Sequence, residues 1–215
     1  MRKKLGYILI GLGAALILSA LLLLIYNQWE NKQAKESSES MLVDVQTAIQ
    51  EQAAIETPSL PEEPAKTEEE TEEEVEETEP TPTKIAMING YNYIGILNLP
   101  GLMLELPVLS DCDEALLKIA PCRDYGDLST DDLVIAAHNY RNHFGRLSQL
   151  KSGDEVTFTD MNGVVHRYQI EKSMMIGAGD VALVVDSGYE LVLYTCDYTN
   201  QNRIAVYCRK VSADA

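Results

Sequence analysis

The sequence predicts an all-β domain that follows one membrane-spanning helix and a disordered acidic linker. Three observations lead to this prediction. An apolar stretch near the start has no charge, a run rich in glutamate and proline comes later, and the remainder alternates short apolar runs with turn residues. We therefore divide the chain into a basic cytoplasmic N-terminus (1–4), a transmembrane helix (5–26), a juxtamembrane stalk and linker (27–84) and one extracellular folded domain (85–215).

The apolar segment Leu5–Tyr26 has 22 residues and no charge. A helix of that length crosses the hydrocarbon core of a bilayer, which is about 30 Å thick. The positive charges of Arg2, Lys3 and Lys4 precede it, so the positive-inside rule places the N-terminus in the cytoplasm and the rest outside. A cleaved signal peptide has a shorter apolar core, about 7 to 15 residues, so we expect an uncleaved single-pass anchor.

The segment after the anchor is polar and changes composition along its length. Residues 27–52 are compatible with either a short juxtamembrane helix or a solvated stalk. Between Glu51 and Pro80 there are about 13 Glu and one Lys with four prolines, which predicts an extended, disordered linker. This linker holds most of the net charge of −17. No cluster of Lys and Arg is present elsewhere, which excludes nucleic acid as a partner.

The folded domain has about 125 residues, a normal size for one domain with its own core. Many short strands separated by turns are typical of a closed barrel or a sandwich. Pro100-Gly101 and Asn162-Gly163 are turn signals, and the second predicts a hairpin. Acidic residues at the start of Asp113–Ala120, followed by apolar residues three and four apart, predict a short helix that Pro121 ends.

The elements expected are, in chain order, strands Asn92–Leu99 and Met103–Leu109, the helix Asp113–Ala120, strand Leu133–Ala137, a helical turn within Phe144–Leu150, strands Glu155–Thr159, Val164–Lys172 and Val181–Val185, and two final strands, Glu190–Cys196 and Arg203–Cys208.

Three polar residues at strand ends form a candidate site. Cys196 ends one predicted strand and Arg203 begins the next, so the sulfur and the guanidinium are expected to face one pocket. A nearby positive charge favours the thiolate, which is the nucleophilic form of cysteine. His138 follows the strand Leu133–Ala137 and is the candidate proton donor. Each residue alone is more often structural, and their joint pattern supports a catalytic role.

With these residues in this order, the chain resembles the sortases, the membrane-anchored cysteine transpeptidases of Gram-positive bacteria. Residues 192–196, Val-Leu-Tyr-Thr-Cys, resemble the family's Thr-Leu-any-Thr-Cys signature, and Arg203 stands where its essential arginine is expected. Ala137-His138 resembles its Gly-His segment. Two departures, Val192 for Thr and Ala137 for Gly, remove no reacting group and leave the sortase class open. The resemblance covers residues 93–211.

The resemblance implies an eight-stranded β-barrel with short helices, a choice that periodicity alone leaves open. It also implies acyl transfer. Cys196 attacks the threonine carbonyl of a Leu-Pro-any-Thr-Gly-like sorting signal on a secreted protein, cleaving between Thr and Gly. His138 acts as general acid and then base, and Arg203 stabilises the oxyanion or the substrate carbonyl. The acceptor is an amine of a peptidoglycan precursor or of a pilin. Thr195, Asn139 and Asn202 are expected to support the site or bind substrate, and no cofactor or metal is expected.

The remaining cysteines and histidines give no further site. Cys112 and Cys122 flank the predicted helix and are either a disulfide pair or, with Cys208, buried thiols. No spacing matches a zinc site, and His143 is interpreted as a surface loop residue.

Two other functions stay open at this point. One is a non-catalytic, membrane-anchored binding ectodomain that keeps a sortase-like barrel. The other is a different cysteine peptidase or an L,D-transpeptidase of the cell wall, although papain-like peptidases place Cys before His and the compact L,D-transpeptidase signature is absent.

Overall fold

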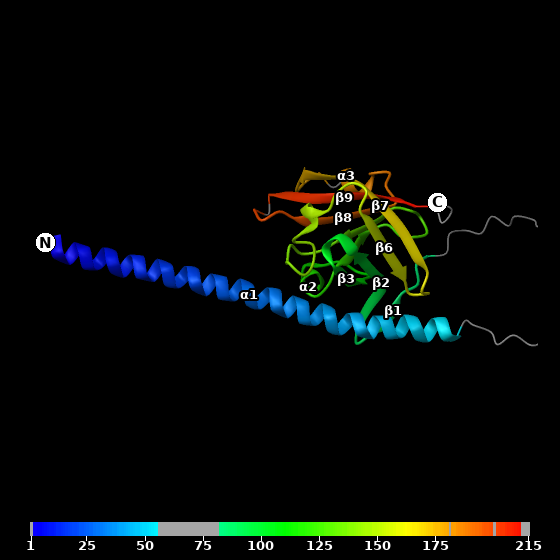
Figure 1. Cartoon of the computed structure of the whole chain (residues 1–215), viewed down its shortest axis with the longest axis horizontal. Helices are drawn as coiled ribbons and strands as arrows, with labels where there is room; N and C mark the ends of the chain where they lie inside the picture. Colours follow the sequence, from blue (N-terminus) through cyan, green and yellow to red (C-terminus); the bar gives the residue numbers. More distant parts are fainter. Residues whose placement is uncertain (1, 56–81, 181, 200, 212–215) are drawn as a thin grey trace, which may run out of the picture.

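A computed structural model describes residues 2–55, 82–180, 182–199 and 201–211. One long helix and a β-barrel that lies along its C-terminal half make up this part of the chain (Figure 1). The predicted acidic linker falls mainly on residues 56–81, which lie outside the described residues.

Nine strands and five short or long helical segments follow one another in the described residues. The strands are β1 (Ala86–Ile88), β2 (Tyr91–Leu99), β3 (Leu104–Leu109), β4 (Cys122–Tyr125), β5 (Leu133–Ala136), β6 (Glu155–Asp160), β7 (Val165–Gly177), β8 (Leu191–Cys196) and β9 (Asn202–Lys210). The helices are α1 (Arg2–Ile55), α2 (Glu114–Leu117) and α3 (Ala182–Val185), with 3₁₀ turns η1 (Pro100–Leu102) and η2 (Leu147–Gln149).

Eight of the strands close into a barrel. Their order is β2-β3-β4-β5-β8-β9-β7-β6, and β6 pairs again with β2, while β1 adds to the free part of β2. Closure removes the exposed edges that an open sheet would leave. The prediction of an all-β, eight-stranded barrel with short helices is therefore confirmed.

The closing seam depends on one glycine. Gly95 of β2 is paired on both sides, with Val108 of β3 and Asp160 of β6. Its φ is +153°, and a Cβ there would lie 2.2 Å from the carbonyl oxygen of Thr159 and 2.7 Å from the Phe158 ring. Only a residue without a side chain permits β2 and β6 to approach this closely.

Apolar side chains from all around the barrel fill its interior. They include Leu97 of β2, Ile135 of β5, Phe158 of β6 and Leu193 of β8, each fully buried. Burying such a side chain contributes about 1.5–3 kcal/mol, so these short runs stabilise the barrel although none is long enough to be a conspicuous element. The core leaves the strand ends free to present polar groups.

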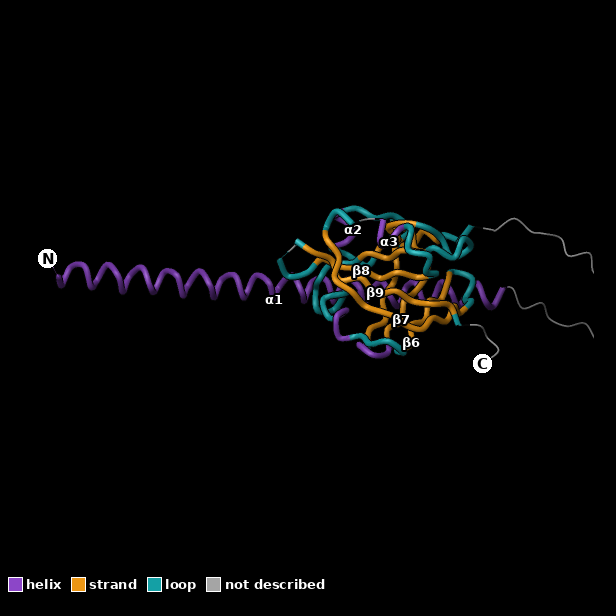
Figure 2. Tube along the Cα trace, turned by 90° about the horizontal axis from the view of Figure 1, so that it is seen from above, coloured by secondary structure: helices purple, strands orange, loops and turns teal. Residues whose placement is uncertain are grey.

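The helix α1 extends well beyond the predicted span of residues 5–26. Of the described residues, this helix alone is long and apolar enough to cross a membrane. Its later part has a buried stripe, Ala34, Ser38, Val45 and Ile49, at the spacing of one helix face. This stripe packs on the barrel beside β2 and β3, and Figure 2 shows α1 running beneath the barrel. Residues 27–52, for which the sequence allowed either a short helix or a solvated stalk, are thus helical and pack against the barrel.

Two local predictions were wrong. Residues 182–185 form the helical turn α3 instead of part of a strand, with Val184 buried and Leu183 exposed. Periodicity does not distinguish a short apolar strand from a buried helical turn. The helix expected at Asp113–Ala120 is a single turn, α2, which the Asp113 carboxylate caps by accepting from the Leu116 N–H. The strand β4 that follows it was not predicted.

Candidate active site

Strand pairing places His138 and Cys196 at the same edge of the barrel. Strands β5 and β8 are parallel neighbours, with Ala136 opposite Tyr194. The pairing continues beyond β5, because the Ala137 N–H donates to the Tyr194 carbonyl at 3.2 Å. His138 follows two residues after Ala136, and Cys196 follows two residues after Tyr194. The two residues, 58 positions apart in the chain, therefore stand near the carboxyl ends of two adjacent strands.

Arg203 contacts the sulfur of Cys196 directly. The two residues are register partners in the antiparallel pair β8 and β9, and Nη1 of Arg203 donates to Sγ of Cys196 at 3.1 Å. Both side chains are half-buried. A guanidinium N–H donated to sulfur stabilises negative charge on it. The structure thus brings together the thiol and the cation that the sequence pairs.

The loop between these strands is organised by Asp197. Its carboxylate accepts hydrogen bonds from the backbone N–H groups of Thr199, Gln201 and Asn202 and from the Asn202 side chain at 3.1 Å. The Thr199 hydroxyl, together with the Asn202 groups, lowers the pKa of Asp197 to about 2. Asn202 therefore holds the loop that precedes Arg203. We assign it a structural part in the turn.

Thr195 and Asn139 join the two strand ends. The buried Thr195 hydroxyl donates to the carbonyl of Ala137 at 2.8 Å, next to His138. The Asn139 side chain donates to the carbonyl of Asp197 at 3.4 Å. Both contacts lie one residue from the candidate catalytic groups, so they fix the spacing between the segments that bear His138 and Cys196.

His138 is half-buried and its Nε2 is buried without a hydrogen-bond partner among the described residues. Burial lowers the pKa of His138 and the charge of Lys118 lowers it further, while Glu114 and Glu30 act in the opposite direction. The ring of Tyr140 lies 4.9 Å from the His138 ring, centroid to centroid. A histidine in this environment gives up its proton readily.

The interpretation of His143 as a surface residue was wrong. Its side chain is fully buried beneath α1, with Nε2 3.5 Å from the Ser38 hydroxyl. Burial, and secondarily the charge of His138, lowers its pKa to about 4. The Tyr140 ring lies 5.6 Å from the His143 ring. The docked part of α1, which the sequence alone left open, provides the cover.

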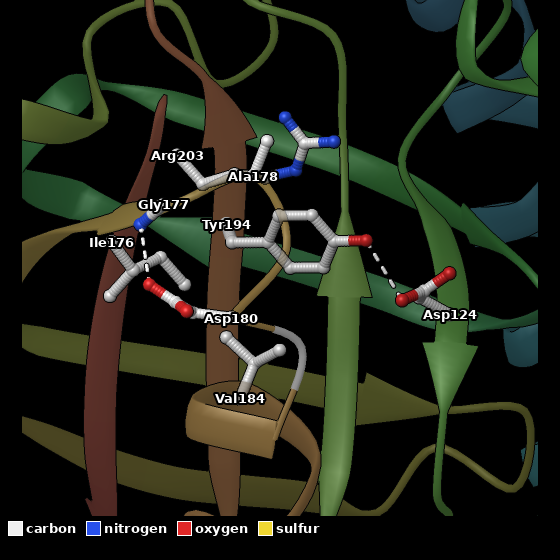
Figure 3. A pocket seen from close by; sticks show the side chains of 8 residues that line it. All are labelled: Asp124, Ile176, Gly177, Ala178, Asp180, Val184, Tyr194 and Arg203. Atoms are coloured by element: carbon white, nitrogen blue, oxygen red, sulfur yellow. Dashed lines mark hydrogen bonds between the residues drawn. The ribbon is translucent and has the colours of Figure 1, made fainter. Parts of the chain in front are cut away.

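A pocket of about 90 Å³ opens beside Arg203 (Figure 3). Ile176 and Val184 give it apolar walls, and the Tyr194 hydroxyl donates to the Asp124 carboxylate across it at 2.8 Å. Sequence reasoning missed Tyr194 and Asp124 as site residues. The alternation of a strand contained part of the signal, since Tyr194 lies two residues from Cys196 and so on the same face of β8.

The other cysteines are free thiols, so the disulfide left open for Cys112 and Cys122 is not formed in this structure. The contact with Cys112, and then burial, raise the pKa of Cys122, and burial raises the pKa of Cys208 to about 12. Neither buried thiol is suited to nucleophilic attack. Within the described residues no three His, Cys, Asp or Glu side chains are grouped to hold a metal ion.

Known proteins of similar fold were found among solved structures. The barrel is similar to sortase A from Corynebacterium diphtheriae, at 21% identity and a TM-score of 0.51, over 58% of this chain and 63% of that one. Sortase C1 from Streptococcus agalactiae matches at 22% identity and 0.51, over 59% and 72%. A Clostridium perfringens sortase D5 transpeptidase matches at 16% and 0.51, over 59% and 83%. The chain thus spans less than two thirds of that sortase A.

The sequence comparison agrees with the fold. No curated protein matches the chain. A family model described as the Sortase domain matches residues 97–211, just over half of the chain, and this range includes the segments that bear His138, Cys196 and Arg203. The chain therefore belongs to the sortase family, a family of cysteine transpeptidases.

Proposed function

We propose that this protein is a membrane-anchored transpeptidase that cleaves a Leu-Pro-any-Thr-Gly-like sorting signal between Thr and Gly through a thioester on Cys196. The acyl group then passes to an amine of a peptidoglycan precursor or of a pilin. The donors are secreted proteins that bear the signal at their C-terminus. The N-terminal helix anchors the protein in the membrane with the barrel outside the cell.

The observation that carries this proposal is the hydrogen bond of 3.1 Å from Arg203 to the Cys196 sulfur, with His138 at the end of the adjacent parallel strand. Pairing fixes Cys196 relative to Arg203, and His138 lies two residues past the end of β5. A nucleophile, a donor to the oxyanion and an acid–base group are the groups with which enzymes catalyse acyl transfer.

In the first half-reaction, the Cys196 thiolate attacks the threonine carbonyl carbon. The C–S bond forms and the carbonyl electron pair moves onto oxygen. Arg203 has five N–H donors, so Nη1 can hold the sulfur while another N–H donates to the oxyanion. When the oxyanion collapses, the C–N bond breaks and the departing amine takes a proton from His138. A thioester and a neutral His138 remain.

In the second half-reaction, the acceptor amine attacks the thioester carbonyl and His138 takes its proton. The new amide forms, the C–S bond breaks and the thiolate returns beside Arg203. The lowered pKa of His138, caused mainly by burial, favours the neutral imidazole that this step requires. One histidine therefore serves in both directions.

The pocket beside Arg203 is our candidate for the part of the sorting signal that precedes the threonine. Its walls from Ile176 and Val184 suit an aliphatic side chain. The Tyr194–Asp124 pair closes one side and gives the pocket a polar edge. Peptides that differ in the part of the sorting signal before the threonine should therefore differ in KM.

The test uses the full-length protein in detergent micelles with fluorescent peptides carrying Leu-Pro-any-Thr-Gly variants, with and without an added amine. We expect amine-dependent transfer and an acyl adduct on Cys196 by mass spectrometry. Cys196→Ala should abolish both, whereas Cys112→Ala, a change at another incompletely buried thiol, should keep them. No adduct and no turnover with any peptide would refute the proposal in favour of a non-catalytic binding ectodomain.

A further inference from the structure

A continuous set of contacts leads from the anchor helix to His138. The Ser38 hydroxyl on α1 lies 3.5 Å from His143 Nε2, the His143 ring lies 5.6 Å from that of Tyr140, and the Tyr140 ring lies 4.9 Å from that of His138. Two rings, those of His143 and Tyr140, thus stand between α1 and His138, the proposed acid–base group. The proposed mechanism uses neither of them.

The loop that carries these rings is also held by α1 at a second place. The backbone N–H of Arg141 donates to Asn31 Oδ1 at 3.0 Å, and the Asn142 side chain donates to the Asn31 carbonyl at 3.3 Å. Asn31 and Ser38 are seven residues apart, two turns on one face of α1. The helix therefore contacts the loop at two positions, Asn31 and Ser38.

Internal hydrogen bonds hold the loop 138–145 rigidly, so it cannot adjust locally when one of its residues is displaced. The N–H groups of His143 and Gly145 both donate to the Tyr140 carbonyl at 2.9 Å, and the Phe144 N–H donates to the His138 carbonyl at 3.2 Å. A Cβ on Gly145 would lie 2.3 Å from the Asn139 carbonyl oxygen, so the turn is folded tightly on itself. A shift of His143 must therefore move Tyr140 and His138 with it.

His138 itself has few other constraints. Its Nε2 has no hydrogen-bond partner in the described part of the chain, and the ring that it faces is that of Tyr140. A general acid needs an orientation fixed to within a fraction of an ångström, which packing and a supporting layer of residues supply. Here the supporting layer ends on α1.

The helix surface is suited to this contact. Ala34 lies one turn before Ser38 on the buried stripe and is 4% exposed. The backbone carbonyl of Ala34 raises the pKa of His143, whereas burial lowers it. A small residue at this position leaves room for the imidazole against the helix backbone. A larger residue would displace His143.

We infer that the segment Asn31–Ser38 of the anchor helix is part of the active site, and that it orients His138 through the positioning residues His143 and Tyr140. The inference rests on the proposed transpeptidase activity. One helix then both anchors the protein in the membrane and orients the acid–base group. Its docking fixes the orientation of the His138 ring and leaves the Cys196–Arg203 contact unchanged.

The experiment compares variants of the full-length protein in micelles. Ala34→Leu and Tyr140→Ala should each lower kcat by at least tenfold with the KM for peptide within twofold, while Tyr140→Phe, which keeps the ring, should retain activity. Ser40→Ala is the matched control, because among the described residues its exposed hydroxyl bonds only to the Ser37 carbonyl within α1. Unchanged kcat in Ala34→Leu and Tyr140→Ala, or a rise in KM with loss of the thermal transition, would overturn the inference.

A second readout separates this inference from the proposed function. The NMR signals of the His138 imidazole should move in Ala34→Leu and Tyr140→Ala and stay in place in Ser40→Ala, whether or not any peptide is turned over. A wild-type protein without a Cys196 adduct refutes the transpeptidase proposal alone. If the His138 NMR signals are the same in Ala34→Leu, Tyr140→Ala and wild type, only the positioning role of α1, His143 and Tyr140 is refuted.

Discussion

Arg203 and Cys196 are the final register partners of the antiparallel pair β8 and β9, and Nη1 of the arginine lies 3.1 Å from the sulfur. The geometry of this contact comes from the sheet, since the loop between the strands is closed separately by Asp197. The guanidinium therefore remains beside the sulfur before substrate arrives. This arrangement makes the identity of the cation matter as well as its charge.

Arg203→Lys should lower kcat/KM by roughly 10²- to 10³-fold, the loss typical of one oxyanion donor. A lysine keeps the charge but cannot donate to sulfur and oxyanion from a planar fork. Steady-state cleavage of the best peptide measures this. Arg209→Lys, at an exposed arginine paired with Glu171 and Glu190, is the control and should change kcat/KM by less than twofold. Equal activity of the two variants would contradict an oxyanion role for Arg203.

The pKa of His138 should respond in opposite directions to two nearby charges. Burial is the main reason that this pKa is low, Lys118 lowers it further and Glu114 raises it. Lys118→Gln is therefore expected to raise the pKa of His138, and Glu114→Gln to lower it. NMR titration of the His138 ring measures both. A shift of the same sign in the two variants would contradict this account of its electrostatics.

Acid should weaken the folded, docked structure through His143. Its pKa is lowered from 6.5 to about 4, so between these values the unfolded chain binds a proton that the folded chain does not. Stability from this group is complete above about pH 6.5, falls as the pH drops toward 4, and amounts to about 3 kcal/mol. His143→Gln should flatten this part of the curve of unfolding free energy against pH. An identical pH dependence in both proteins would refute the assignment.

Gly95→Ala should destabilise the closing seam of the barrel. A Cβ there would meet the Thr159 carbonyl at 2.2 Å, and the positive φ adds strain, so we expect a loss of about 2–5 kcal/mol. Gly90→Ala is the matched control, because φ is also positive but no atom lies within 4 Å, and it should cost about 1 kcal/mol. Denaturant unfolding separates the two. Similar losses would show that the clash at Gly95 is relieved by adjustment of β6.

The sequence predicted the contact between Arg203 and Cys196 but not the surroundings of the site. These two residues stand on consecutive strands joined by a short loop, so a local pattern was enough to place them together. His138 was a candidate because an apolar strand precedes it and because the order of the three residues resembles that of the sortases. His143 was misplaced because its cover is a helix more than 100 residues earlier in the chain. No local pattern contains such a contact, and the polar surface of residues 27–52 concealed the buried stripe that makes it.

The elements between the site residues were also harder to predict for a physical reason. The strand β4, with Asp124, is short and includes charged residues, so hydrophobic alternation is weak there. The turn α3 is apolar like a strand, and only its packing against Tyr207, whose hydroxyl donates to the Leu183 carbonyl, distinguishes it. Both elements line the pocket beside Arg203, which is why the sequence did not reveal that pocket.

Because α1 is one continuous helix, it fixes the distance between the proposed membrane span and the proposed active site. A helix rises 1.5 Å per residue, so Asn31, which holds the loop of His138, lies about 7.5 Å along the axis beyond Tyr26. With the membrane span ending at Tyr26, as we propose, the catalytic edge stays within a few helical turns of the bilayer surface. In this proposed arrangement, peptide bonds presented close to the lipid would be within reach and those held far from it would not. The helix would then select substrates by their distance from the membrane before any side chain is recognised.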